Sequence, residues 1–90
     1  MDTTQLLQKW SSGDEQALDS LLPRVYEELR AIAHGRLAVR QRSDTISTTV
    51  LVHEAYVRLV DGRRAMPKDR SHFLAIASRA MRFILVDYAR

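Results

Sequence analysis

The sequence predicts an all-α fold, a small bundle of about four helices. Apolar residues recur at three- and four-residue spacing in four successive segments, which is the pattern of helices with one buried face. No segment alternates apolar and polar residues for long enough to predict a strand, and no tight hairpin turn separates two apolar strands. The 90 residues are enough for one small domain.

The first helix is predicted from Thr4 to about Ser12. Its apolar face is formed by Leu6, Leu7 and Trp10. Gly13 follows, and glycine tolerates the left-handed conformation that commonly ends a helix. Asp14 is a favourable N-cap for the next helix, because its carboxylate can accept a hydrogen bond from a free backbone N–H group.

The second helix carries the longest apolar stripe of the chain. The stripe consists of Leu18, Leu21, Leu22, Val25, Leu29, Ile32 and Ala33. Pro23 lies inside the stripe and removes a backbone donor, so we expect a kink there. A complete break is not expected, because the stripe continues in phase beyond Pro23. Gly35 weakens the far end of the pattern, and residues 41–47 are predicted to form a loop that ends in a helix cap.

The third and fourth helices are predicted over residues 48–61 and from about residue 71 to the end, with Ser47 and Ser71 as their N-caps. The third helix is expected to bury Val52, Ala55, Tyr56, Leu59 and Val60. The fourth is expected to bury Phe73, Ile76, Ala77, Ala80, Ile84 and Tyr88. Between them, residues 62–70 form a predicted loop with four positive charges.

Composition excludes several classes of protein. The chain has no cysteine, which excludes disulfides, iron–sulfur clusters and thiolate metal sites. No N-terminal apolar signal is present, and no stretch approaches the roughly 18 apolar residues that a membrane span requires. These features predict a cytoplasmic protein that binds no cofactor.

Positive charge is concentrated in the C-terminal half. Residues 1–45 carry 6 Lys or Arg and 7 Asp or Glu, whereas residues 46–90 carry 8 and 4, a net charge of +4. Such a basic half suits a polyanionic partner such as nucleic acid. An ordinary solvated surface explains the same charge, so composition alone leaves both interpretations open.

The pair His53-Glu54 is similar to the start of the zinc motif His-Glu-x-x-His, in which two histidines four residues apart share a metal ion. The second histidine would be residue 57, which is Val57. The remaining histidines, His34 and His72, lie in separate segments. No other catalytic motif is present, so the sequence predicts neither a metal site nor an enzyme.

Two sets of exposed residues are candidates for binding. On the third helix, the outward residues are Val50, His53, Glu54, Val57 and Arg58. The two valines would suit a protein-docking stripe, although isolated surface valines are common and explain the same pattern. The basic set consists of Arg63, Arg64, Lys68, Arg70, His72, Arg79, Arg82 and Arg90, and would suit nucleic acid.

The order of three blocks resembles the second domain of a bacterial RNA polymerase sigma factor of the extracytoplasmic-function (ECF) type. The blocks are LLPRVYEELRAIA (21–33), LVHEAYVRLVD (51–61) and HFLAIASRAMRFILVDYAR (72–90). They match the family patterns LLPxVYxELRxxA, LVxEAYxRLVD and HFxAxAxxAMRxILVDxAR. The resemblance covers nearly all of the chain and implies a helical domain that acts in transcription initiation.

The resemblance also implies roles for the two candidate sets. The outward residues of the third helix would dock on the clamp helices of the polymerase β′ subunit, with Glu54 suited to an arginine on the clamp. The basic set would engage the promoter minus-ten element and hold the unpaired non-template strand, including a flipped base. Asp87 is expected to organise a neighbouring arginine, because a carboxylate that faces phosphate is unfavourable.

In members of this family, the domain that the 90 residues resemble is followed by a further helical domain that reads the minus-thirty-five element. The 90 residues are expected to hold only the domain that binds the minus-ten element. An anti-sigma factor is a further candidate partner that the resemblance suggests. The alternative function is a sigma-like interaction module or decoy, which would bind polymerase or an anti-sigma factor without opening a promoter. Such a decoy should tolerate neutralisation of the basic loop, whereas a promoter-opening domain should not.

Overall fold

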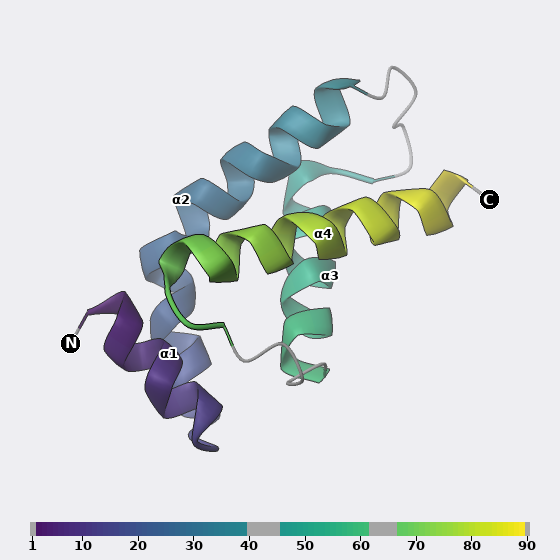
Figure 1. Ribbon diagram of the computed structural model, residues 1–90. Helices are drawn as coiled ribbons and strands as arrows, with labels where there is room; N and C mark the ends of the chain where they lie inside the picture. The colour runs from purple at the N-terminus through teal and green to yellow at the C-terminus, as the bar shows by residue number, and fades with distance from the viewer. Residues whose placement is uncertain (1, 40–45, 62–66, 90) are drawn as a thin grey trace.

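A computed structural model describes residues 2–39, 46–61 and 67–89 of the chain. These residues form four α-helices and no strand: α1 (Thr3–Ser11), α2 (Gln16–Val39), α3 (Thr48–Asp61) and α4 (Arg70–Ala89). α1 packs against α2, while α2, α3 and α4 pack against one another, with α4 crossing α3 in Figure 1. The predicted all-α bundle is therefore confirmed.

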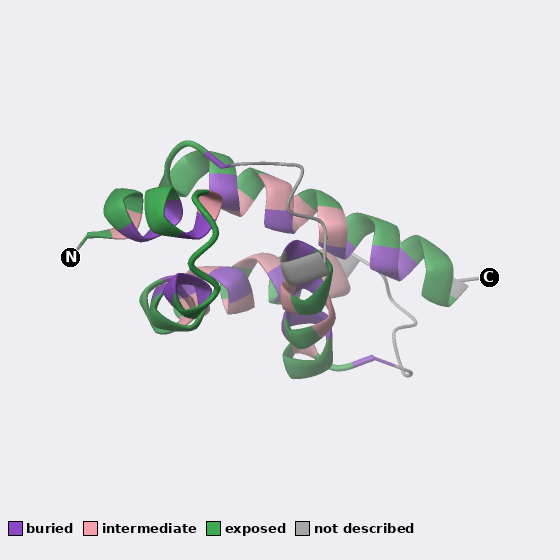
Figure 2. Ribbon diagram, turned by 90° about the horizontal axis from the view of Figure 1, so that it is seen from below, coloured by how far each residue is buried: buried purple, intermediate pink, exposed green. Residues whose placement is uncertain are grey.

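The core lies where the buried faces of the four helices meet (Figure 2). Its members include Leu6, Leu7, Trp10, Leu18, Leu21, Val25, Leu29, Leu51, Val52, Leu59, Phe73, Met81, Ile84 and Leu85. Every buried side chain of a described residue in this core is apolar, and no polar or charged residue of the described ranges is buried. Polar chemistry in this part of the chain is therefore confined to the surface.

The first two helices begin and end at the residues that capping chemistry favours. Asp2 and Gln5 form a capping box, in which the Gln5 N–H donates to the Asp2 carboxylate at 2.8 Å, so α1 begins one residue earlier than predicted. Gly13 has a φ of 108°, as expected for the residue that ends α1. The Asp14 carboxylate accepts a hydrogen bond from the Gln16 N–H at 3.1 Å, which supports its predicted role at the start of α2.

α2 continues without a break past both Pro23 and Gly35. Pro23 is exposed, so water can satisfy the backbone carbonyl that loses its donor. The buried stripe of α2 extends on both sides of the proline, from Leu18 and Leu21 to Val25 and Leu29. Packing of this stripe outweighs the local cost of proline, which is why the helix is not split.

α3 starts at the predicted cap. The Ser47 hydroxyl accepts a hydrogen bond from the Val50 N–H at 3.2 Å, and the Ser47 carbonyl accepts one from Leu51 at 2.9 Å. Of the predicted inward residues, Val52, Ala55 and Leu59 are buried and Tyr56 is half-buried, whereas the side chain of Val60 lies outside the described part. Leu51 is also buried, on the same side as Ala55.

The predicted cap of α4 is wrong by two residues. The Asp69 carboxylate accepts a hydrogen bond from the His72 N–H at 2.8 Å, and the Asp69 carbonyl accepts one from Phe73 at 2.9 Å. Asp69 is therefore the N-cap, and Ser71 lies within the first turn. A carboxylate is favoured over a hydroxyl at this position because it also interacts with the positive end of the helix dipole.

The predicted inward face of α4 is also partly wrong. The buried residues are Phe73, Ala77, Met81, Ile84 and Leu85. Ile76 and Ala80 are only half-buried, because they flank this stripe. Tyr88 is 42% exposed rather than buried. Tyr88 lies one turn after Ile84 on the same side of α4. The last core residue of α4 is Leu85, so the Tyr88 ring lies at the edge of the bundle.

The corrected cap leads to a prediction on stability. Asp69→Ala should lower the free energy of unfolding by about 1 kcal/mol, because the His72 N–H loses its acceptor. Ser71→Ala is the matched control and should change the free energy of unfolding by less than about 0.5 kcal/mol. Urea denaturation followed by circular dichroism measures both. A larger loss for Ser71→Ala than for Asp69→Ala would contradict the assigned cap.

Within the described ranges, none of the helices combines the length and the apolar character that crossing a membrane requires.

Candidate functional site

The outer face of α3 presents two exposed apolar residues. Val50 is 42% exposed and Val57 is 54% exposed, and they lie two helical turns apart on the side opposite the buried Val52 and Leu59. The complete outer face consists of Val50, His53, Glu54, Val57 and Arg58. The structure thus brings together all five residues that the sequence assigned to this set, and we call them the α3 outer face.

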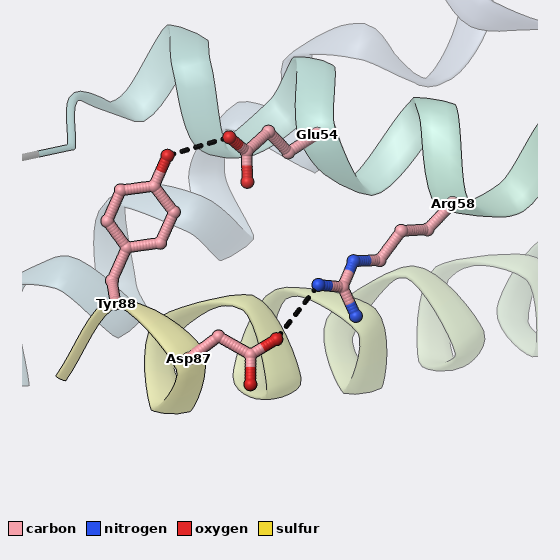
Figure 3. A network of polar contacts seen from close by, with 4 residues as sticks. All are labelled: Glu54, Arg58, Asp87 and Tyr88. Atoms are coloured by element: carbon pink, nitrogen blue, oxygen red, sulfur yellow. Dashed lines mark hydrogen bonds and ion pairs between the residues drawn. The ribbon is translucent and has the colours of Figure 1, made fainter. Parts of the chain in front are cut away.

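Two residues of the α3 outer face are bonded to the last turns of α4 (Figure 3). The Tyr88 hydroxyl donates to the Glu54 carboxylate, with 2.7 Å between Oη and Oε1. The Arg58 guanidinium pairs with the Asp87 carboxylate at 3.0 Å. Asp87 therefore organises a neighbouring arginine, as predicted, whereas the role of Tyr88 was not predicted.

The bond to Glu54 affects how Tyr88 titrates. The hydrogen bond to the carboxylate is the main cause that raises the pKa of Tyr88 above its usual value, with smaller contributions from burial and from the negative charge of Glu54. The cause is that a phenolate could no longer donate this bond. The bond therefore favours the neutral form of Tyr88, which is the form that can donate it.

An equivalent bond joins α3 to α2 at another place. The Tyr56 hydroxyl donates to the Asp19 carboxylate at 2.6 Å. This hydrogen bond, followed by burial and the charge of Asp19, raises the pKa of Tyr56 to about 12. The chain therefore contains a second tyrosine–carboxylate pair with the same chemistry as the pair Tyr88–Glu54.

The histidine of the His53-Glu54 pair is exposed on the α3 outer face. Across the described part of the chain, no group of three or more His, Cys, Asp or Glu side chains is arranged to hold a metal ion. The carboxylate next to His53 is bonded to Tyr88. His53 and Glu54 are therefore adjacent polar residues on the surface of a helix.

The basic candidates lie around the start of α4 and along it. Lys68, Arg70 and His72 lie at its start, and Arg79 and Arg82 are exposed further along. Arg63, Arg64 and Arg90 lie outside the described residues.

Their local contacts differ. Arg70 pairs with Glu28 of α2, so part of its charge is already neutralised. The His72 imidazole accepts the backbone N–H of Lys68 at Nδ1, with 3.1 Å between the atoms. Neither Arg79 nor Arg82 bonds to another described residue. The side chain of Lys68 is exposed and likewise has no bond to a described residue. Lys68, Arg79 and Arg82 are therefore the described cations of the candidate set most available to phosphate groups.

Arg82 also lines a groove between α2 and α4 that the sequence did not predict. The groove has a volume of about 430 Å³ and is lined by Ala31, Ile32, Gly35, Arg36, Ser78, Arg82, Leu85 and Val86. The Arg36 guanidinium donates to the Ser78 hydroxyl from Nε and Nη2, at 3.1 and 2.7 Å. No local sequence signal marks Arg36, because its partner lies 42 residues away in the chain.

Comparison with known proteins gives one positive result. The family model described as ECF sigma factor matches residues 1–90, the whole chain. No curated protein and no solved structure matches it. Because the family model covers every helix described above, the resemblance noted in the sequence is confirmed. The chain belongs to the ECF sigma factor family, whose members are non-catalytic factors of transcription initiation.

Proposed function

We propose that residues 1–90 form the second domain of an ECF sigma factor, which binds core RNA polymerase and opens promoter DNA at the minus-ten element. The α3 outer face docks on the clamp helices of the β′ subunit. The basic residues at the start of α4 and along it hold the unpaired non-template strand. These partners place the action of the chain in the cytoplasm. An anti-sigma factor that covers either surface is a further partner within this proposal.

The exposure of Val50 and Val57 on either side of Glu54 is the observation that carries the docking part of the proposal. Two exposed apolar side chains can be buried favourably against a partner. A carboxylate between them can orient the partner and select one that carries a positive charge. The partner proposed for this face is the pair of clamp helices of β′. Glu54 would meet a basic side chain there.

Charge and exposure support the DNA part of the proposal. Arg79 and Arg82 lie free of carboxylate partners among the described residues, and Lys68 is exposed beside the start of α4. A cation without a carboxylate partner can neutralise a phosphate without first breaking an ion pair within the protein. Arg63, Arg64 and Arg90 belong to the proposal on the strength of the sequence alone. Arg70 contributes less, because Glu28 already neutralises it.

The docking part is tested by measuring the affinity of the 90-residue chain for a purified β′ clamp-helix fragment by calorimetry. Val50→Asp/Val57→Asp should weaken binding roughly 30-fold or more, since two charged groups would be placed in an apolar contact. Circular dichroism should show an unchanged fold, because both positions are exposed.

The matched control is Phe83→Asp, which makes the same kind of change at a side chain of α4 that is 55% exposed. Its affinity for the clamp fragment should equal that of the unchanged chain. Failure of the folded, unchanged chain to bind the fragment would refute the polymerase part of the proposal. Equal losses for Phe83→Asp and for the valine variant would refute the placement of docking on α3.

A further inference from the structure

Two bonds tie the α3 outer face to the last turns of α4, and they involve the two oppositely charged residues of that face. Glu54 is bonded to Tyr88 at 2.7 Å, and Arg58 is paired with Asp87 at 3.0 Å (Figure 3). We infer that Tyr88 and Asp87 are positioning residues for polymerase docking, which hold Glu54 and Arg58 apart so that the Glu54 carboxylate stays available to a cation on the partner. This inference rests on the proposed function.

Spacing along α3 makes the separation unexpected. Glu54 and Arg58 are four residues apart with the acid first, which is the favourable arrangement for an ion pair along a helix. In the structure they do not pair with each other, and each is bonded to a residue of α4 instead. If they paired, the charge of Glu54 would be cancelled by its own helix before any partner arrived.

Asp87 accounts for the position of Arg58. Its carboxylate competes with Glu54 for the same guanidinium and holds it on the α4 side. The side chains of Arg58 and Asp87 are 47% and 57% exposed. An ion pair with this much exposure to solvent contributes little to stability. Orientation of Arg58 is therefore a better account of this pair than stabilisation of the fold.

Tyr88 accounts for the position of the carboxylate. Its hydroxyl donates to Oε1 of Glu54 and leaves the second oxygen able to accept from a partner. A neutral donor fixes the Glu54 side chain and leaves its negative charge intact. An arginine in the same place would cancel that charge. Fixing the rotamer in advance also reduces the conformational entropy lost on binding.

The test is a double-mutant cycle in the clamp-fragment assay with the full 90-residue chain. Tyr88→Phe removes the hydroxyl and keeps the ring, and Asp87→Asn releases Arg58 toward Glu54. Each should weaken binding about threefold to tenfold. In a Glu54→Gln background neither change should weaken binding further, because both residues act through the Glu54 carboxylate. A merely structural role would give the same loss in both backgrounds.

Tyr56→Phe is the matched control, because it removes a hydroxyl that donates to the Asp19 carboxylate in an equivalent bond. Its affinity should equal that of the unchanged chain. If Glu54→Gln weakens binding while Tyr88→Phe and Asp87→Asn do not, the inference is wrong and the proposed function stands. If the unchanged chain does not bind the fragment, both are wrong. Thermal unfolding of each variant shows whether a lost affinity reflects lost folding.

Discussion

Phe73→Ala is expected to leave much of the chain unfolded at 37 °C. Among the described residues, Phe73 is the largest fully buried side chain. Replacing a buried phenylalanine by alanine costs about 3–5 kcal/mol, through lost burial and the cavity that remains. A domain of this size has a total stability of about 5–15 kcal/mol, and small domains lie at the low end of that range. Thermal unfolding followed by circular dichroism at 222 nm measures the effect.

Phe83→Ala is the matched control for Phe73→Ala. The same atoms are removed ten residues further along α4, from a side chain that is 55% exposed. We expect a change in the free energy of unfolding within about 0.5 kcal/mol, because no cavity forms at the surface. The comparison separates burial from helix propensity, since both changes replace Phe by Ala within one helix. Similar losses for the two variants would mean that α4 does not pack through the face that contains Phe73.

The fold was largely predictable because its helices depend on local signals. Periodic apolar residues predicted all four helices, and Gly13, Asp14 and Ser47 predicted ends that the structure confirms. The cap of α4 was predicted at Ser71 rather than Asp69, because both residue types are good caps and the two lie only two residues apart. The hydrogen bonds that the His72 and Phe73 N–H groups donate to Asp69 identify Asp69 as the cap.

The inward face of α4 shows why periodicity has limits near the end of a helix. Tyr88 has the correct phase to be buried, since it lies four residues after Ile84. Phase predicts the side of a helix on which a residue lies, but not where the neighbouring helices end. At Tyr88 the core has already ended, and the ring instead reaches Glu54 with its hydroxyl. A residue predicted for the core therefore became part of the surface.

The positions of the residues on the α3 outer face were predictable, but their bonds were not. The exposure of Val50 and Val57 follows from their positions opposite the buried residues of α3. The partners of Glu54 and Arg58 lie 34 and 29 residues away in the chain, and contacts over such separations leave no local pattern. The sequence suggested that Asp87 would orient an arginine, but only the fold identifies that arginine as Arg58.

Neutralising Arg79 and Arg82 of α4, which have no bond to another described residue, is expected to weaken DNA binding strongly. Arg79→Gln/Arg82→Gln should weaken binding of single-stranded DNA about 10- to 100-fold at low salt, because the two phosphate contacts proposed for these arginines would be lost. The dependence of log K on log salt concentration should become shallower by about 1.4, since each contact on a single strand contributes roughly 0.7. Fluorescence anisotropy with a labelled oligonucleotide, measured over a series of salt concentrations, gives both quantities.

The slope decides between a promoter-opening domain and a decoy, because it counts phosphate contacts rather than net charge. Lys9→Gln/Arg24→Gln is the matched control, since it removes the same charge from two exposed residues of α1 and α2. If the arginines of α4 contact the strand, only their removal changes the slope, whereas the control lowers the affinity slightly through the overall field. Equal slopes for the two variants would instead mean that the charge of α4 is ordinary solvated surface. A sigma-like decoy predicts that second result, because docking through α3 requires no contact with DNA.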